Sequence, residues 1–199
     1  MSNTIITISR SYGSGGRTIG KMLAKSRDIP FYDRDLIYLA SEKSGIDIGL
    51  LSQNDESLKK SLFEIRIPTE KNQYVSKDEM FRTQSQIIRD VADKSDCVII
   101  GRCADHILKD GKHKLLRVFI HAPEYHCVQT VMDTFNISEA EAVKTIKQVN
   151  KHRADYYKYH TGTEWGSAAN FDLCFDTSRL SYEKIVKAIS GYVYLFTTL

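Results

Sequence analysis

Short apolar runs alternate along the chain with longer segments in which apolar residues recur every three or four positions. Four runs, at 4–9, 97–100, 115–120 and 171–176, are rich in β-branched and aromatic residues, and a further extended segment is expected at 31–33. Runs of this length are typical of strands buried on both faces, and the longer period is typical of helices packed against them. The pattern therefore predicts an α/β fold in which helices cover both faces of a five-stranded parallel sheet.

Capping signals mark where several helices begin. Segments 76–79 and 138–141 both have the sequence Ser-x-x-Glu, the capping-box pattern that satisfies the first N–H groups of a helix. We expect helices from 76 to about 94 and from 138 onward, a helix that starts at Pro123, and a last helix over 181–195.

The region after 33 is less regular. Asp33 or Asp35 is expected to cap a second helix that stops near Gly45. Residues 46–75 mix polar side chains with isolated apolar ones and contain Pro68, so we interpret this stretch as an insertion.

Composition excludes several classes of protein. With 199 residues, 42% of them hydrophobic, one compact domain is expected without disulfides or structural metal. A net charge of +3 gives no indication of nucleic-acid or membrane binding, and no apolar run approaches the roughly 20 residues of a membrane span. The four cysteines form no C-x-x-C pair, and the N-terminus has no signal-peptide pattern. We therefore expect a cytoplasmic protein with reduced thiols.

The strongest chemical motif, Ser-Arg-Ser-Tyr-Gly-Ser-Gly-Gly-Arg-Thr at 9–18, lies between the first strand and the first helix. Such a turn exposes backbone N–H groups at a helix N-terminus, where they bind anions such as phosphate. The window 11–18 follows the P-loop pattern G-x-x-x-x-G-K-[ST], with serine for the first glycine and arginine for the lysine. The expected phosphate-binding residues are Ser11, Gly13, Ser14, Gly15, Gly16, Arg17 and Thr18. Thr18 is also the candidate Mg²⁺ ligand.

Three alternatives for this loop stay open. A frame shifted by one residue places Gly16 at the lysine position of the pattern. The spacing of glycines over 13–18 nearly matches a dinucleotide-binding fingerprint, with Asp33 close to the required distance, although the third glycine is missing. The glycines could also serve only a tight turn between a strand and a helix.

Several segments together resemble the cytidylate kinase-like family, a branch of the P-loop kinases. They are ISRSYGSGGRTIG at 8–20, FYDRD at 31–35, IGRCAD at 100–105, and YHTGTEW with FDLC between 159 and 174. The resemblance extends over nearly the whole chain except much of 46–75. It implies a three-layer P-loop NTPase fold, with ATP and Mg²⁺ as cofactors and nucleotides as substrates.

The resemblance also implies roles for individual residues. The acceptor segment of cytidylate kinases corresponds to 32–39, where an aspartate and a tyrosine match and Leu39 replaces an arginine. The lid stretch that carries arginines corresponds to 150–153. The expected acceptor-binding residues are Asp33, Tyr38, Arg102 and Asp105. Asp33 could instead cap a helix, and Arg102 could pair with Asp105.

Phosphoryl transfer mainly requires positioning, Mg²⁺ and cations around the transferred group. The chain supplies cations from separate segments, and those expected to be catalytic are Arg17, Arg102, Lys151 and Arg153. Lys151 also lies at helical spacing from Lys144 and Lys147, which could form only a solvated helix face.

We therefore predict one P-loop kinase domain over 1–199, with an acceptor-binding insertion at 46–95 and a lid at 138–170. The expected activity is ATP-dependent phosphorylation of a nucleoside monophosphate, with CMP or dCMP as the first acceptor to test. Two alternatives are a small-metabolite kinase and a non-catalytic nucleotide-binding protein, the second because the P-loop lysine is missing. The sequence leaves the presence of a homo-oligomer open.

Overall fold

A computed structural model of the protein describes residues 2–33 and 77–198. The helix expected after Asp33, the irregular segment 46–75, Tyr38 and the first residue of the 76–79 capping box all lie outside the described residues.

Five strands form one parallel sheet in the order β2-β3-β1-β4-β5, as predicted from the apolar runs. They are β1 (Thr4–Arg10), β2 (Phe31–Tyr32), β3 (Cys97–Ile100), β4 (Lys114–His121) and β5 (Leu173–Asp176). The first strand is central: Ile8 lies opposite Ile100 of β3 on one side and Val118 of β4 on the other. The carboxyl ends of β1, β3 and β4 therefore meet at one edge of the sheet.

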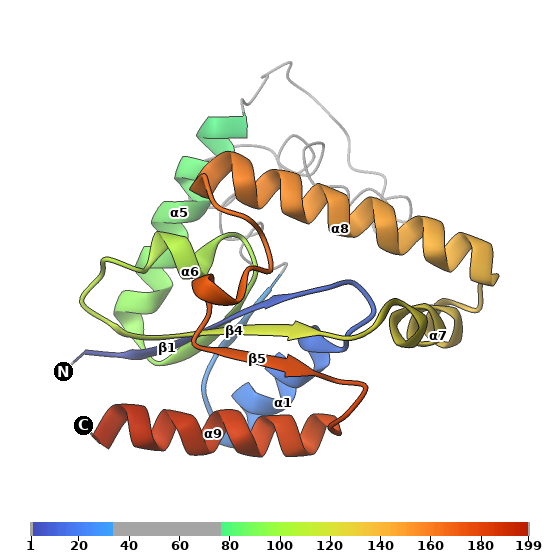
Figure 1. Ribbon diagram of the computed structural model, residues 1–199. Helices are drawn as coiled ribbons and strands as arrows, with labels where there is room; N and C mark the ends of the chain where they lie inside the picture. Colours follow the sequence, from blue (N-terminus) through green and yellow to red (C-terminus); the bar gives the residue numbers. More distant parts are fainter. Residues whose placement is uncertain (1, 34–76, 199) are drawn as a thin grey trace, which may run out of the picture.

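Helices cover both faces of this sheet (Figure 1). They are α1 (Gly16–Arg27), α5 (Lys77–Lys94), α6 (Ala104–Ile107), α7 (Glu124–Phe135), α8 (Glu139–Thr161), the short 3-10 helix η1 (Ala168–Asn170) and α9 (Tyr182–Thr198). Helices α1 and α9 pack on one face, whereas α5 and α6 pack on the other. The long helix α8 packs on α7 and lies above the α5–α6 side of the sheet.

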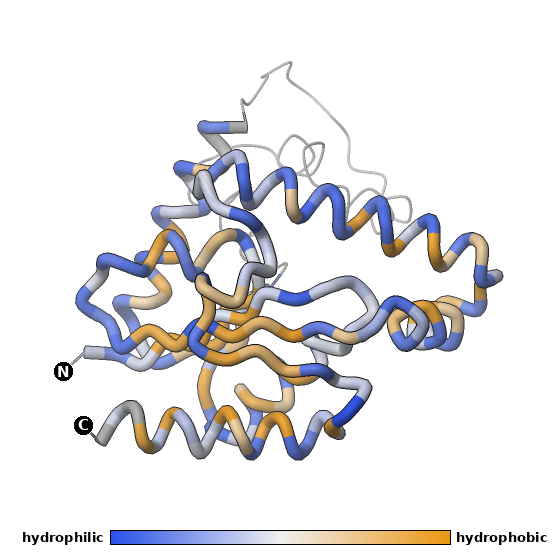
Figure 2. Tube along the Cα trace, viewed as in Figure 1, coloured by the Kyte–Doolittle hydropathy of each residue, from blue (hydrophilic) through white to orange (hydrophobic). Residues whose placement is uncertain are grey.

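The alternation of side chains along β1 explains the layers. Ile6 and Ile8 are buried with Leu23 of α1 and Ile189 of α9. Ile5 points to the other face and is buried with residues of α5 such as Ile88. Successive residues of a strand point to opposite faces, so an apolar run is needed when both faces are covered. Figure 2 shows apolar positions gathered on the strands, while much of α8 is hydrophilic.

A local signal sets the start of one element, and a long-range contact accompanies the start of another. Ser138 caps α8 as predicted: its side chain accepts from the N–H of Glu141, and the Glu141 carboxylate accepts from the N–H of Ser138. The last strand starts at Leu173, two residues later than expected. Asp172 instead holds Arg117, accepting from its backbone N–H at 2.8 Å and from its guanidinium at 2.7 Å.

The four cysteines are free thiols. Within residues 2–33 and 77–198, no helix has both the length and the apolar character needed to cross a membrane.

Candidate phosphate-binding site

The loop between β1 and α1 turns at two glycines in the left-handed region. Gly13 has φ 83° and Gly15, the N-cap of α1, has φ 77°. A Cβ on Gly13 would lie 2.6 Å from the Cys127 carbonyl oxygen, and one on Gly15 only 2.1 Å from the Tyr182 hydroxyl. Backbone conformation and close neighbours both require glycine at these positions.

Side chains within the loop hold its shape. The buried Ser14 hydroxyl lies 2.9 Å from the carbonyl oxygen of Ser11 and 3.1 Å from that of Ile120. The Ser11 N–H also donates to the Ile120 carbonyl at 3.0 Å, which fastens the loop to the end of β4. The Ser14 side chain therefore points inward, and its hydroxyl supports the loop.

The N-terminus of α1 offers backbone donors. The first bond inside the helix runs from the Ile19 N–H to the Gly15 carbonyl at 3.0 Å, and no side chain caps this end. The N–H groups of Gly16, Arg17 and Thr18 precede that bond, so helix geometry gives them no partner within α1. Arg17 and Thr18 are exposed. This end of α1 therefore has the donors and the positive dipole potential that suit an anion such as phosphate.

Arginines from separate elements gather beside this helix end, around Asp33. Asp33 directly follows β2 and is only 7% exposed. The Arg17 Nε donates to Asp33 Oδ2, and Arg10 Nη2, from the end of β1, lies 4.0 Å from Asp33 Oδ1. Arg102, in the turn after β3, has φ 59°. Arginines from the end of β1 and from α1 thus meet the carboxylate that follows β2.

Helix α8 adds a further cation and contacts the loop backbone. Arg153 Nη1 donates to the Arg10 carbonyl at 2.9 Å, and its guanidinium carbon lies 5.5 Å from the centre of the Tyr12 ring. Asn150 accepts from the Tyr12 N–H at 2.8 Å. The segment predicted as a lid therefore rests directly on the loop through two side chains.

Burial lowers the pKa of Arg153, and repulsion from nearby arginines adds to the shift. Desolvation is the largest cause, followed by repulsion from Arg10, while Tyr12 and Asp33 act in the opposite direction and Arg102 adds repulsion. The guanidinium stays protonated, since arginine does not lose its proton in proteins. A lowered pKa means that the positive charge is disfavoured here, so binding of an anion would relieve the repulsion.

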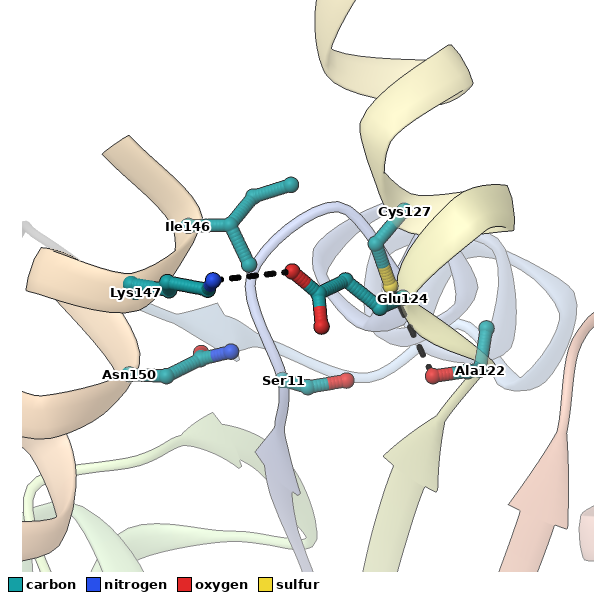
Figure 3. A pocket seen from close by; sticks show the side chains of 7 residues that line it. All are labelled: Ser11, Ala122, Glu124, Cys127, Ile146, Lys147 and Asn150. Atoms are coloured by element: carbon teal, nitrogen blue, oxygen red, sulfur yellow. Dashed lines mark hydrogen bonds and ion pairs between the residues drawn. The ribbon is translucent and has the colours of Figure 1, made fainter. Parts of the chain in front are cut away.

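A cavity of about 350 Å³ lies on the other side of the loop, toward β4 (Figure 3). It is lined by Ser11, Ala122, Glu124, Cys127, Ile146, Lys147 and Asn150. Lys147 Nζ of α8 lies 3.7 Å from Glu124 Oε1 of α7, so an ion pair crosses this space. The arginines lie toward β2 and β3 instead, and the geometry for anion binding therefore depends on the loop and not on this cavity.

Asp105 and Lys151 are placed away from the arginines. Asp105, at the start of α6, is 4% exposed and accepts a hydrogen bond of 2.6 Å from the Tyr157 hydroxyl. Burial raises the pKa of Asp105, with the Tyr157 hydrogen bond opposing, and raises the pKa of Tyr157 as well. The Lys151 side chain is 75% exposed and pairs with Asp155 at 2.5 Å. Asp105 thus joins α6 to α8, and Lys151 lies on the solvent face.

Within the described parts of the chain, no three His, Cys, Asp or Glu side chains form a group that could hold a metal ion. Magnesium that is held mainly by phosphate oxygens and water does not require such a group. Thr18, on the first turn of α1, is the side chain here that could supply a hydroxyl ligand.

The sheet order and the glycine loop after its central strand agree with a family comparison. A model of the cytidylate kinase-like family matches residues 5–179. The chain belongs to the cytidylate kinase-like family. This confirms the resemblance in sequence, and makes the chain a member of a nucleotide-binding family with a P-loop kinase fold.

Two relatives of this family member are named for different activities. A cytidylate kinase from Sulfurisphaera tokodaii is 23% identical over 190 residues, covering 95% of this chain and 94% of that protein. An S-adenosylmethionine-dependent nucleotide dehydratase from Lacinutrix mariniflava is 25% identical over 191 residues, covering 94% of this chain. The chain spans only 35% of the length of that protein.

Solved structures agree on the fold of the family member. An uncharacterized protein from Eubacterium ventriosum has a TM-score of 0.72 at 25% identity, with 96% of this chain and 98% of that chain covered. A shikimate kinase from Bacteroides thetaiotaomicron has a TM-score of 0.56 at 15% identity, with the same coverage. The three-layer P-loop kinase fold is thereby confirmed.

Two members of the site have no catalytic or binding role in the sequence motifs. Arg10 follows the first apolar run, which favours a position facing the crevice, but the loop motif assigns it no function. Asn150, in the lid stretch, accepts from the loop backbone. Its signal was its place at helical spacing from Arg153, which contacts the same loop.

Proposed function

We propose that this protein is an ATP-dependent phosphotransferase that acts on a nucleoside monophosphate, with CMP or dCMP as the first acceptors to test. The observation that carries the proposal is the convergence of arginines from β1, α1 and α8 beside the uncapped N-terminus of α1. Phosphoryl transfer depends mainly on such cations, because charge is spread over the phosphoryl oxygens in the transition state.

The proposed roles follow from these positions. Backbone N–H groups over 13–18 would bind phosphates of ATP, and Thr18 would add a hydroxyl ligand to a phosphate-bound Mg²⁺. Arg102 and Arg153 would neutralise charge on the transferred group. Asp33, with Tyr38 from the part of the chain that is not described, would bind the acceptor. Residues 46–95 would form the acceptor region and 138–170 the lid.

Two residues from the sequence prediction have weaker support in this role. The Asp105 carboxylate is buried against Tyr157, and Lys151 is paired with Asp155 on the exposed face of α8. Within the described residues, neither side chain forms a hydrogen bond or ion pair with the loop. We therefore assign Asp105 to the α6–α8 junction.

The test is formation of ADP by the purified chain from ATP and Mg²⁺ with a panel of nucleoside monophosphates. We expect turnover with CMP or dCMP. A thermal-shift measurement with ATP runs alongside, since a ligand at about 100 times its dissociation constant adds roughly 2.7 kcal/mol of stability. Folded protein that yields no ADP with any member of the panel would rule out the kinase activity.

A second candidate, nucleotide binding without turnover, is favoured by one observation. No lysine follows the loop glycines, and the arginine at position 17 is engaged by Asp33. This candidate predicts that ATP raises the melting temperature while no acceptor yields ADP.

A further inference from the structure

Arg10 fills the space into which a side chain at position 16 would extend. Gly16 is the first residue of α1, and a Cβ built on it would lie 2.6 Å from the Arg10 Cβ and 3.1 Å from its Cγ. The Ile120 Cβ would be 3.2 Å away on another side. Real Cβ atoms essentially never come as close as 2.6 Å, so without a shift the backbone admits a side chain at position 10 or at position 16, but not at both.

The guanidinium of Arg10 lies farther along the same crevice. A Cβ on Gly101, which directly follows β3 and has φ 65°, would come within 2.3 Å of Arg10 Nη1. Arg10 Nη2 lies 4.0 Å from Asp33 Oδ1, and the side chain is 20% exposed. The arginine therefore runs from the end of β1, past the first turn of α1, to the ends of β3 and β2. Open parallel sheets bind their ligands at this edge.

The sequence frame gives this geometry a meaning. In the frame that begins at position 10, Arg10 stands where the P-loop pattern has its first glycine, and Gly16 stands where it has lysine. The glycine at 15 then matches the second glycine of the pattern, and it is the left-handed N-cap of α1. A cation and a glycine have exchanged places, and their side-chain volumes compensate in space.

We propose that Arg10 is the phosphate-binding cation of this loop, in place of the lysine that the P-loop pattern has at position 16. The inference rests on the proposed binding of a nucleoside triphosphate at the loop. A guanidinium binds two phosphate oxygens at once, whereas an ammonium group acts as a point charge. An arginine at position 10 in place of a lysine at position 16 therefore keeps the positive charge at the phosphates but changes the geometry of the hydrogen bonds.

A structural role is the competing explanation. Arg10 would then serve only as an ion-pair partner of Asp33, and its removal would lower stability without a specific effect on phosphate affinity. The two explanations differ in one measurable quantity, the contribution of the phosphates to nucleotide affinity.

The experiment compares the affinities of the full chain for ATP and for adenosine, which has no phosphate, by isothermal titration calorimetry. Three variants are matched to the question: Arg10→Gln, the exchange variant Arg10→Gly/Gly16→Lys, and Lys187→Gln on the exposed face of α9 as a control. Melting temperatures and circular dichroism establish that each variant is folded.

We expect Arg10→Gln to weaken ATP binding by about 10- to 100-fold, the effect of one hydrogen-bonded charge, while adenosine affinity changes little. The exchange variant should recover ATP affinity to within a few-fold of the wild type, and Lys187→Gln should match the wild type. Gly16→Lys alone should lower the melting temperature more than the exchange variant does, because the Arg10 stem still fills the space.

Unchanged ATP affinity in folded Arg10→Gln would overturn the role of Arg10 and leave the proposed function standing. A wild-type protein that does not bind ATP at all would contradict the proposed function itself. If Arg10→Gln does not fold, the exchange variant decides alone: near-wild-type ATP affinity supports the proposal, and lost affinity in a folded exchange variant overturns it.

Discussion

Two buried carboxylates follow neighbouring strands of the sheet, and their surroundings differ. Asp33 follows β2 and faces the guanidinium groups of Arg17 and Arg10. Asp105 follows β3 and accepts a hydrogen bond from the hydroxyl of Tyr157. Both are at most 7% exposed, so burial does not separate them. Their partners differ. The arginines around Asp33 supply more positive charge than its carboxylate neutralises, which favours binding of an anion. The Tyr157 hydroxyl at Asp105 joins α6 to α8.

This difference gives each region a distinct expected response to mutation. Neutral substitutions among the arginines near Asp33 should mainly change ligand binding and turnover. Substitutions at the Asp105–Tyr157 pair should mainly change the free energy of unfolding. Four predictions test this division.

The largest effect is expected for Arg153→Gln. Glutamine keeps a donor for the Arg10 carbonyl but removes the charge, and loss of a transition-state arginine typically costs on the order of 10³ in rate. ADP formation measures this loss, with the melting temperature as the check on folding. Lys151→Gln, two residues away on the solvent face, is the matched control and should retain most of the activity. A larger loss of activity in Lys151→Gln than in Arg153→Gln would identify Lys151, and not Arg153, as the catalytic cation.

Tyr157→Phe should lower stability without a specific loss of turnover. It leaves the buried Asp105 carboxylate without its 2.6 Å donor, and an unsatisfied buried group costs about 1–3 kcal/mol. Urea unfolding measures the change. Tyr159→Phe is the control on the same helix, because its hydroxyl donates to Asp78 at an exposed position and its removal should matter little. Equal effects of the two substitutions would argue against a structural role for the Asp105 junction.

The stability of Asp105→Asn relative to the wild type should increase as the pH rises. Burial raises the pKa of Asp105, so its stabilising contribution is complete below the unfolded value of about 3.9 and is lost as the pH rises through the folded value. The asparagine oxygen can still accept from Tyr157. Urea unfolding of variant and wild type at pH 4 and pH 7 should therefore show the variant gaining on the wild type at pH 7.

Asp176→Asn is the control of opposite sign for this pH dependence. Hydrogen bonds from Ser178 lower the pKa of Asp176, so the wild type should gain stability relative to that variant as the pH rises. The same direction in both variants would contradict the assignment of the Asp105 shift to burial.

The smallest effect is expected for Arg17→Gln. Its side chain is 51% exposed, and partly exposed ion pairs contribute about 0–1 kcal/mol, so the free energy of unfolding should fall by less than about 1 kcal/mol. Chemical denaturation of wild type and variant without ligand measures this. Lys25→Gln, exposed near the end of the same helix, serves as the reference for a charge change on α1. A loss of several kcal/mol would mean that the Asp33 region is a structural junction too.

Much of the fold followed from the sequence because each element has a local signal. Apolar runs predicted the strands, and the Ser138–Glu141 capping box predicted the start of α8. The start of β5 was predicted two residues too early because it depends on a long-range contact, the ion pair between Asp172 and Arg117. No local pattern near residue 172 contains that information.

The candidate site was predicted less completely, since partners decide roles. Asp33 and Asp105 have the same side chain at similar places after a strand, and only the folded chain brings arginines to one and a tyrosine to the other. Lys151 is different: Asp155, four residues later, was visible in the sequence as a helical ion-pair partner. The P-loop pattern gives Arg10 no role, because it has its cation directly after the glycines.

The central place of β1 has a consequence for how the chain folds during synthesis. This strand is made before both of its neighbours, β3 and β4, which are translated only after residue 96. Parallel pairing between such distant segments is slow, and unpaired apolar strands aggregate readily. The nascent β1 therefore stays without its two strand partners until residues 97–121 have been translated.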